Sequence, residues 1–336
     1  MWPPGFQVES IIPSHGSDVL AKIALEVERA VAQRALTGAR GRVTGRQLAR
    51  GEGWTVEDVI CTSGPQDRPF EEHHAHVSIG IVAAGTFQYR SAAGSELMTP
   101  GSLLLGNAGQ CFECGHEHGS GDRCLAFRYA PDYFERLAAD AGASGATRTF
   151  RLLRLPPLRR LAPLVARACA GLAGSAAVAW EEVSVHLAAQ VVQLVNALRA
   201  DGSGAPGNAV ARVTRTVRAI ERRPSARLTL EWLAREAGLS PYHFLRTFER
   251  VTGVTPHQYV LRARLREAAL RLAAERARII DIALDCGFGD VSNFNRSFRA
   301  EFGVTPRAYR LRAGPGWKRQ PHAPTQDPGR RVPWTP

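Results

Sequence analysis

The sequence predicts an α+β protein, in which a β-barrel with flanking helices is followed by an all-α domain. Three observations support this prediction. Short β-branched runs broken by glycine fill residues 54–130, a helical motif occurs twice in the C-terminal third, and the excess of positive charge lies in that same third. A chain of 336 residues is long enough for two domains that each bury their own core.

Residues 1–53 are predicted to form a helical extension of the barrel. Apolar residues recur at helical spacing between 17 and 37, and the stretch rich in glycine and arginine that follows, up to Gly53, is interpreted as a connector. Within 54–130 the runs WTVEDVIC, VSIGIVAAG, TFQYRS and SLLLGNAG are interpreted as strands joined by turns. Several short strands at close spacing indicate a small sandwich or barrel.

The segment from 131 to 200 is predicted to be helical. Its apolar face within 178–198 allows two interpretations: a helix packed on the barrel, or a surface for a second copy of the chain. DGSGAPGN at 201–208 is predicted to be a flexible linker, and the proline-rich, basic residues 313–336 a disordered tail. The basic helical domain between them spans 209–312.

The positive charge of the chain is concentrated in its C-terminal part. The formal net charge is +12 at pH 7. Residues 205–336 contain 24 Lys and Arg against 11 Asp and Glu, whereas residues 1–204 contain 19 against 20. A basic domain can serve solubility, but this distribution also favours a polyanion such as DNA as the partner.

The sequence favours a cytoplasmic protein that does not enter a membrane. No run of about 18 apolar residues occurs, so no membrane span is expected. The opening MWPPGFQVES lacks the charged-then-apolar order of a signal peptide. The six cysteines of so long a chain do not indicate a disulfide framework.

The C-terminal third contains an internal repeat. LAREAGLSPYHFLRTFERVTGVTPHQY at 233–259 resembles IALDCGFGDVSNFNRSFRAEFGVTPRAY at 282–309. Phe248 and Phe298 lie 50 positions apart, as do the glycines, threonines and tyrosines of the two G-V-T-P-x-x-Y runs. Each copy has a helix, a glycine-containing turn, a second helix and a G-V-T-P stop, which is the layout of a helix-turn-helix. A helical bundle with solvated arginines is the alternative, and two matching copies argue against it.

The second helix of each copy is predicted to have one buried and one exposed face. Ser240, followed by Pro241, and Asp290 are expected to cap these helices. The exposed faces carry arginine with polar or aromatic neighbours, which is the chemistry that contacts base edges and phosphates in a major groove. At 100° per residue the inward residues are Phe244, Phe248, Phe294 and Phe298, and the outward ones are Tyr242, Arg246, Glu249, Arg250, Ser292, Arg296 and Arg299.

One long helix, PHQYVLRARLREAALRLAAE at 256–275, is predicted to join the two units rigidly. Together with LAREAGLSPYHFLRTF and CGFGDVSNFNRSFRAEFGVTPRAYR, it makes residues 211–312 resemble the AraC/XylS family of regulators. The resemblance implies two helix-turn-helix subdomains joined by one helix, with double-stranded promoter DNA as the partner. By position it implies that the base-contacting residues are Tyr242, Leu245, Arg246, Ser292, Asn293, Asn295 and Arg296.

Two details complete the predicted DNA interface. Leu245 departs from the polar residue often found at its position in the family, so that it would touch a thymine methyl and not form a hydrogen bond with a base. Arg250 and Arg299 are predicted to supply phosphate contacts.

Members of this family usually carry a sensing or dimerising module, often a cupin-like barrel, before the DNA-binding part. Residues 54–130 are similar to one, so a metal or small-molecule effector is expected there, with a homodimer and RNA polymerase as further candidate partners. The alternative is a cupin-type metalloenzyme fused to a DNA-binding module, because EEHHAH at 71–76 resembles a cupin metal motif. The glutamate and the histidine that complete that motif are missing after His76 and Gly101, so we expect a regulator and not an enzyme.

The segment CFECGHEHGSGDRC at 111–124 is the sharpest candidate for a sensing site. A hairpin turning at 119–121 would place two thiols, two imidazoles and Asp122 on one face, which suits zinc or another transition metal. A redox-sensitive disulfide, an organic effector and a purely structural role are the alternatives. The predicted ligands are Cys114, His116, His118 and Cys124, supplemented by His74 and His76 from a neighbouring strand.

Overall fold

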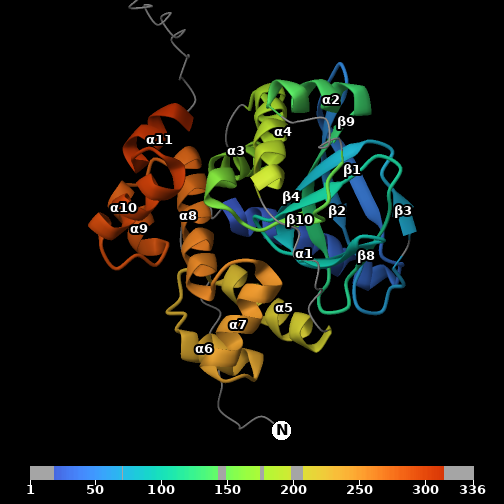
Figure 1. The fold of residues 1–336 in the computed structure, drawn as a ribbon. Coiled ribbons are helices and arrows are strands. Elements are labelled where there is room, and N and C mark those ends of the chain that lie inside the picture. The colour runs from blue at the N-terminus through green and yellow to red at the C-terminus, as the bar shows by residue number, and fades with distance from the viewer. Residues whose placement is uncertain (1–18, 70, 143–148, 175–177, 198–206, 314–336) are drawn as a thin grey trace, which may run out of the picture.

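The computed structural model describes residues 19–69, 71–142, 149–174, 178–197 and 207–313. The strands and their flanking helices come first, and a group of C-terminal helices lies beside them (Figure 1). This arrangement confirms the predicted α+β class. No helix among the described residues is long and apolar enough to cross a membrane.

The strands form two antiparallel sheets. The larger sheet consists, in spatial order, of β1 (Val43–Gly51), β2 (Trp54–Cys61), β9 (Asp122–Tyr129), β4 (Val77–Gly85), β7 (Leu103–Gly106) and β10 (Arg154–Leu155). The smaller sheet consists of β3 (Glu71–His73), β8 (Cys111–Gly115), β5 (Phe87–Ser91) and β6 (Gly94–Met98). Alternate residues of the larger sheet join two different cores, one toward the smaller sheet and one toward the helices.

The first strand lies where the sequence suggested a connector. β1 pairs with β2 along its length, with an irregularity in the register between Gln47 and Ala49. The prediction of a helical extension and connector up to Gly53 was therefore wrong for residues 43–51. Most side chains of β1 are exposed, so the strand shows no apolar alternation, and main-chain hydrogen bonds to β2 hold it at the sheet edge.

Four helices surround the larger sheet: α1 (Val19–Thr37), α2 (Pro131–Asp140), α3 (Ala162–Leu172) and α4 (Trp180–Ala197). Ile23 of α1 and Leu187 of α4 are buried in the same core as Ile79 and Phe127 of the sheet. The apolar face of α4 is thus covered within the chain, which confirms the interpretation of a helix packed on the barrel. The homodimer stays a prediction. Within the segment predicted to be helical, β10 and the 3-10 turn η1 (Arg159–Leu161) interrupt the helices.

The C-terminal unit consists of α5 (Gly207–Arg222), α6 (Leu230–Ala237), α7 (Pro241–Thr252), α8 (Pro256–Ala274), α9 (Ile279–Asp285), α10 (Val291–Phe302) and α11 (Pro306–Ala313). The single long helix that the sequence predicted is α8. Its residues Tyr259 and Ala263 lie in one core with α5, α6 and α7, while Ala268 and Leu272 lie in another with α9 and α10. Because α8 contributes to both cores, it is the shared element of the two repeats.

Two predicted boundaries fall at the edges of the described residues. α5 begins at Gly207, so the last two residues of the predicted linker at 201–208 are helical. The other linker residues, and all of the predicted tail except Ala313, lie outside the described residues.

Candidate nucleic-acid interface and sensing site

The second helix of each repeat begins at the predicted cap. At the start of α7 the Ser240 hydroxyl accepts a hydrogen bond from the His243 N–H, and at the start of α10 the Asp290 carboxylate accepts one from the Asn293 N–H at 2.7 Å. Gly238, left-handed with φ 63°, ends α6 and allows the sharp turn into α7. Both repeats therefore have the layout of a helix-turn-helix, as the sequence predicted.

Pairs of phenylalanines set the rotation of these two helices. Phe244 and Phe248 of α7, and Phe294 and Phe298 of α10, are completely buried. The two rings of each pair lie 5.4 and 5.5 Å apart, a spacing that favours aromatic contact. Because both inward faces are fixed in this way, the opposite faces point away from the cores.

The residues predicted to contact DNA lie on those outer faces. Tyr242 is 63% exposed, and the Arg246 guanidinium lies 5.9 Å from its ring centroid and donates a hydrogen bond to its hydroxyl at 3.2 Å. Leu245 is half-buried. The remaining predicted contact residues are all exposed: Arg250, Ser292, Asn293, Asn295, Arg296 and Arg299.

A groove of about 640 Å³ lies between the two repeats. Leu245 of α7 borders it on one side, and Asn293 and Ser297 of α10 border it on the other, with Arg264 of α8 between them. The second helices of the two repeats, α7 and α10, therefore flank one concave surface. The helices that flank it carry exposed arginines, Arg246 on α7 and Arg296 on α10, so the form of the groove and the charge beside it suit a nucleic acid.

The barrel contacts the first of these helices directly. Arg154 of β10 donates hydrogen bonds to the carbonyls of Val251 and Thr252, at 3.1 and 2.7 Å, in the last turn of α7. Its Nε also donates to Glu96 of β6 at 2.9 Å. A guanidinium at a helix C-terminus interacts favourably with the unpaired carbonyls there. The buried side chain of Arg154 thus connects the N-terminal domain to α7, and Leu97 of β6 packs in the same core as Phe244 and Phe248.

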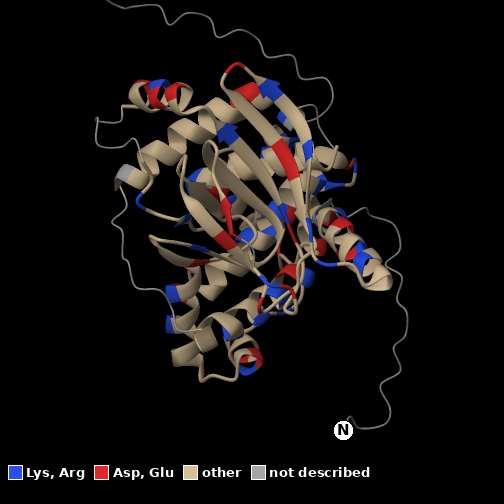
Figure 2. Ribbon diagram, turned by 90° about the vertical axis from the view of Figure 1, so that its right-hand side faces the viewer, with Lys and Arg blue, Asp and Glu red and all other residues tan. Residues whose placement is uncertain are grey.

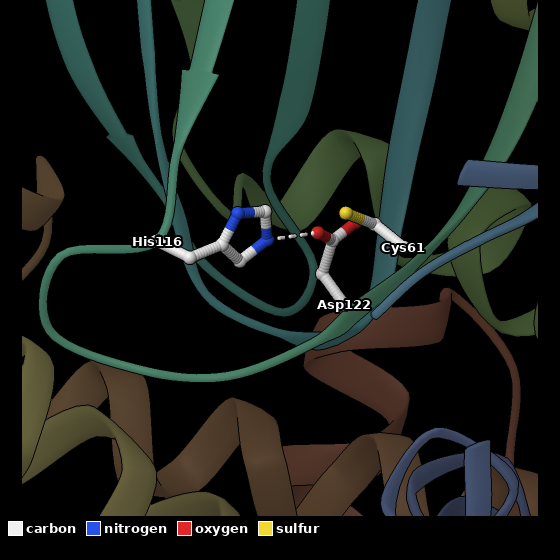
Figure 3. Close-up of side chains that lie close together, drawn as sticks. All are labelled: Cys61, His116 and Asp122. Carbon is white, nitrogen blue, oxygen red and sulfur yellow. Dashed lines mark hydrogen bonds and ion pairs between the residues drawn. The ribbon is translucent and has the colours of Figure 1, made fainter. Parts of the chain in front are cut away.

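Three buried side chains with metal-ligating groups meet at one end of the barrel (Figure 3). Cys61 ends β2 and is the cross-strand partner of Asp122, which begins β9. His116 follows β8 of the opposite sheet, and its Nε2 lies 2.6 Å from the Asp122 carboxylate. One ligand atom from each residue lies within 4.8 Å of the others. A fourth group, the Cys124 thiol, donates to the same carboxylate at 3.4 Å.

The electrostatics of this cluster follow from burial and from Asp122. Burial lowers the pKa of His116, but hydrogen bonds to Asp122 and Cys61 outweigh that effect and raise the pKa to about 9. Burial, with the nearby Asp122 charge, raises the pKa of the Cys114 and Cys124 thiols well above their usual value. Near neutral pH the His116 ring is therefore protonated, and the Cys114 and Cys124 thiols keep their protons.

The predicted cysteine–histidine hairpin was wrong. β8 pairs with β3 and β5 in the smaller sheet, whereas β9 pairs with β2 and β4 in the larger one. Residues 116–121 cross from one sheet to the other, so the register that would have aligned His118 with Asp122 does not exist. Cys114 and Cys124 nevertheless pack against the same core, because both face the space between the sheets.

The structure brings only some of the predicted ligands together. His116 and Cys124 belong to the cluster, and Cys114 packs near it. The His118 side chain is 33% exposed and lies beside Glu117, and His76 is exposed. His74 is buried, but it precedes β4, whose far end pairs with Asp122, so it lies toward the opposite end of the barrel.

Sequence reasoning missed Cys61. The alternation in WTVEDVIC placed it at the end of a strand, which β2 confirms. Its proximity to Asp122 depends on the pairing of β2 with β9, two segments that are far apart in the sequence. No local pattern encodes that pairing.

Two family models match the chain. The AraC-like ligand binding domain matches residues 57–195, and a helix-turn-helix domain model matches residues 233–312. The first covers most of the two sheets with α2, α3 and α4, and the second covers the two repeats. The cluster of Cys61, His116 and Asp122 and the exposed helices α7 and α10 therefore fall in separate matched regions.

Curated relatives resemble the chain over different lengths. It is 35% identical over 92 residues to the transcriptional activator AarP of Providencia stuartii, covering 27% of this chain and 68% of AarP. It is 38% identical over 85 residues to the regulatory protein SoxS of Salmonella typhimurium, covering 25% of this chain and 79% of SoxS. It is 28% identical over 258 residues to the transcriptional activator RhaS of Klebsiella pneumoniae, covering 73% of this chain and 89% of RhaS.

Proposed function

The chain belongs to the AraC family of transcription regulators, and from this premise we propose that it binds promoter DNA through α7 and α10 in response to a signal received by its N-terminal domain. The matched models and the relatives are those of regulators. The protein is accordingly a DNA-binding transcription regulator with a ligand-binding domain, and not an enzyme.

The observation that carries the proposal is the pair of capped helices whose polar faces flank one groove. Arginine can read guanine with two hydrogen bonds, and asparagine can read adenine in the same way. On this basis α7 reads bases through Tyr242, Leu245 and Arg246, and α10 does so through Ser292, Asn293, Asn295 and Arg296. Arg250 and Arg299 contact the flanking phosphates.

The proposed signal is a metal ion or a small molecule that binds in the N-terminal domain. Arg154 joins this domain to the last turn of α7, and Arg262 of α8 donates to the Pro157 carbonyl at 2.6 Å. A ligand that shifts the barrel would therefore shift elements on which the DNA-reading helices rest. The ligand acts only to the extent that it binds the two arrangements with different affinity.

Fluorescence anisotropy with two labelled duplexes tests the DNA-binding proposal. One duplex carries the DNA upstream of the protein's own gene, and the other carries the same bases in scrambled order. Arg296→Ala is expected to weaken binding to the upstream duplex by roughly 1–3 kcal/mol and to leave the scrambled duplex nearly unaffected. Arg136→Ala, on the exposed surface of α2, is the matched control. Equal weakening on both duplexes would assign Arg296 to phosphates, and failure of the unaltered chain to prefer the upstream duplex would refute specific binding.

Activation of transcription is the outcome we propose for this binding. AarP and RhaS are both named transcriptional activators. Activation implies that the protein contacts RNA polymerase at the promoter. If the promoter contains two adjacent copies of the recognised DNA sequence, we expect two copies of the chain to bind there as a homodimer. Transcription in a purified system with the upstream promoter tests the first, and sedimentation of the protein–DNA complex tests the second.

A further inference from the structure

We propose that the end of the barrel at Asp122 binds a divalent transition metal of the zinc type, held by Cys61, His116, Asp122 and Cys124. The ion would be the signal to which the regulator responds. The binding site stands on its own geometry, and only its effect on DNA rests on the proposed function.

Three of the groups, from Cys61, His116 and Asp122, lie with one ligand atom each within 4.8 Å of the others, and the Cys124 thiol adjoins them through its 3.4 Å contact with Asp122. Cys61 and Asp122 are cross-strand partners in the larger sheet, and Cys124 lies two residues further along the same face. His116 reaches them from the smaller sheet, 2.6 Å from the carboxylate. The ligands therefore come from both sheets, and Figure 3 shows the imidazole and the thiol on two sides of the Asp122 carboxylate.

Burial and donor chemistry select the ion. Cys61, His116 and Asp122 are only 6, 5 and 5% exposed, so water has little access to the site. Two sulfurs, one imidazole nitrogen and one carboxylate oxygen form a four-donor set that suits tetrahedral Zn²⁺. Mg²⁺ and Ca²⁺ require more oxygen donors than the cluster offers. The His116 Nδ1 atom is buried without a hydrogen-bond partner among the described residues, while the Nε2 atom of the same ring already points at the Asp122 carboxylate.

The site is connected to the DNA-binding unit by the loop at 116–121. The Ser120 carbonyl accepts a hydrogen bond from Arg218 of α5 at 3.4 Å, and the Gly121 N–H donates to the Ser63 carbonyl at 2.9 Å. A Cβ atom at Gly119 would lie 1.7 Å from the Arg218 guanidinium, so loop and helix are in close contact. Since His116 begins this loop and Asp122 follows it, an ion that joins the two residues fixes both ends of the loop against α5.

Metal binding can be measured without DNA. The reduced full-length chain is stripped with a chelator and titrated with Zn²⁺ or Co²⁺, and bound metal is counted by elemental analysis. We expect about one equivalent, a Co²⁺ spectrum with thiolate charge-transfer bands, and no binding of Mg²⁺. Cys61→Ser, His116→Gln and Cys124→Ser should each lower Zn²⁺ affinity at least about 10-fold.

Matched controls separate this site from the arrangement first suggested by the sequence. Cys111→Ser removes an exposed thiol from β8, and His118→Gln removes the exposed imidazole two residues after His116. Both should bind Zn²⁺ like the unaltered chain. The proposal is overturned if the chain binds less than about 0.2 equivalents of metal. It is also overturned if the two controls lose as much Zn²⁺ affinity as the three ligand variants. Circular dichroism confirms that each variant is folded, and a folded His116→Gln variant with unchanged affinity overturns it as well.

The effect on DNA is tested separately with Arg218→Ala. This variant keeps all four ligands but loses the contact between loop and helix. We expect it to bind Zn²⁺ normally while its affinity for the upstream duplex no longer changes when the metal is added. A metal site with no effect on DNA in the unaltered chain refutes the signalling role alone. A chain that binds no metal but prefers the upstream duplex refutes the site and leaves the proposed function intact.

Discussion

Arg264 and Gly287 join the two repeats: the Arg264 Nη1 donates a hydrogen bond to the Gly287 carbonyl at 2.9 Å. The other nitrogens of the same guanidinium donate to the carbonyls of Pro224 and Ala226, in the turn between α5 and α6 that precedes the first repeat, both at 2.8 Å. Gly287 has φ 85°, and a Cβ atom there would lie 2.6 Å from the Ser225 carbonyl oxygen. The turn before the first repeat thus touches the second repeat at a main-chain contact, in addition to the shared helix α8, and we expect this contact to restrain the angle between α7 and α10.

Replacing Arg264 should therefore affect both stability and DNA reading. In Arg264→Ala three carbonyls lose their donor, and we expect the free energy of unfolding to fall by about 2 kcal/mol. Affinity for the upstream duplex should fall more than affinity for the scrambled one, because the angle between the helices becomes less restrained. Urea unfolding followed by circular dichroism, and anisotropy, measure the two effects. Arg278→Ala, on an exposed arginine paired with Asp281, should change neither. An Arg264→Ala variant with unchanged preference for the upstream duplex would show that α8 alone fixes the angle.

Salt dependence should distinguish phosphate contacts from base contacts. Each phosphate contact contributes about one unit to the slope of log K against log salt concentration. We expect Arg299→Ala to lower that slope by about 1 and to weaken upstream and scrambled duplexes alike. Arg296→Ala should leave the slope nearly unchanged. Anisotropy titrations at several salt concentrations provide both values, and a slope that falls in Arg296→Ala but not in Arg299→Ala would exchange their assigned roles.

The features that the sequence predicted well are local ones. Ser240 and Asp290 cap their helices through contacts three residues away, and the phenylalanines face inward because 3.6 residues complete a turn. Strand β1 escaped prediction because its side chains are exposed, and its place in the sheet depends on hydrogen bonds to β2. The cysteine–histidine cluster was predicted with the wrong partners, because the pairing of β9 with β2 is a tertiary contact.

Removing the link that Arg154 makes between the barrel and α7 should speed amide hydrogen exchange near that link. The Arg154 side chain is 7% exposed and holds the Val251 and Thr252 carbonyls together with Glu96. In Arg154→Ala these acceptors lose a charged donor, and we expect stability to fall by about 1–3 kcal/mol. Amide hydrogen exchange should accelerate in the last turn of α7 and in β6. Arg160→Ala, at an exposed position of η1, is the control. Unchanged exchange in α7 would show that Arg154 does not hold the helix to the barrel.

His74 should make stability depend on pH below neutrality. Its ring stacks on Phe112 with the centroids 4.1 Å apart, and its Nε2 lies 2.8 Å from the Tyr89 hydroxyl. Burial, followed by the nearby Arg128 charge, lowers the pKa of His74 to about 4. Between that value and the unfolded pKa of about 6.5 the unfolded chain binds the proton more strongly. Stability contributed by the neutral ring is therefore present above pH 6.5 and is lost progressively as the pH falls toward 4, by about 3 kcal/mol at most.

A His74→Gln variant isolates this effect from all other titrating groups. The variant should be less stable than the unaltered chain near pH 7, because glutamine does not reproduce the stacking on Phe112. The difference should shrink as the pH falls from 6.5 toward 4, because only the unaltered chain takes up a proton at this position. Urea unfolding at several pH values measures the difference directly, with His76→Gln at an exposed position as the control. A difference that stays constant over this range would mean that His74 titrates alike in the folded and unfolded chains, and that its burial does not favour the neutral ring.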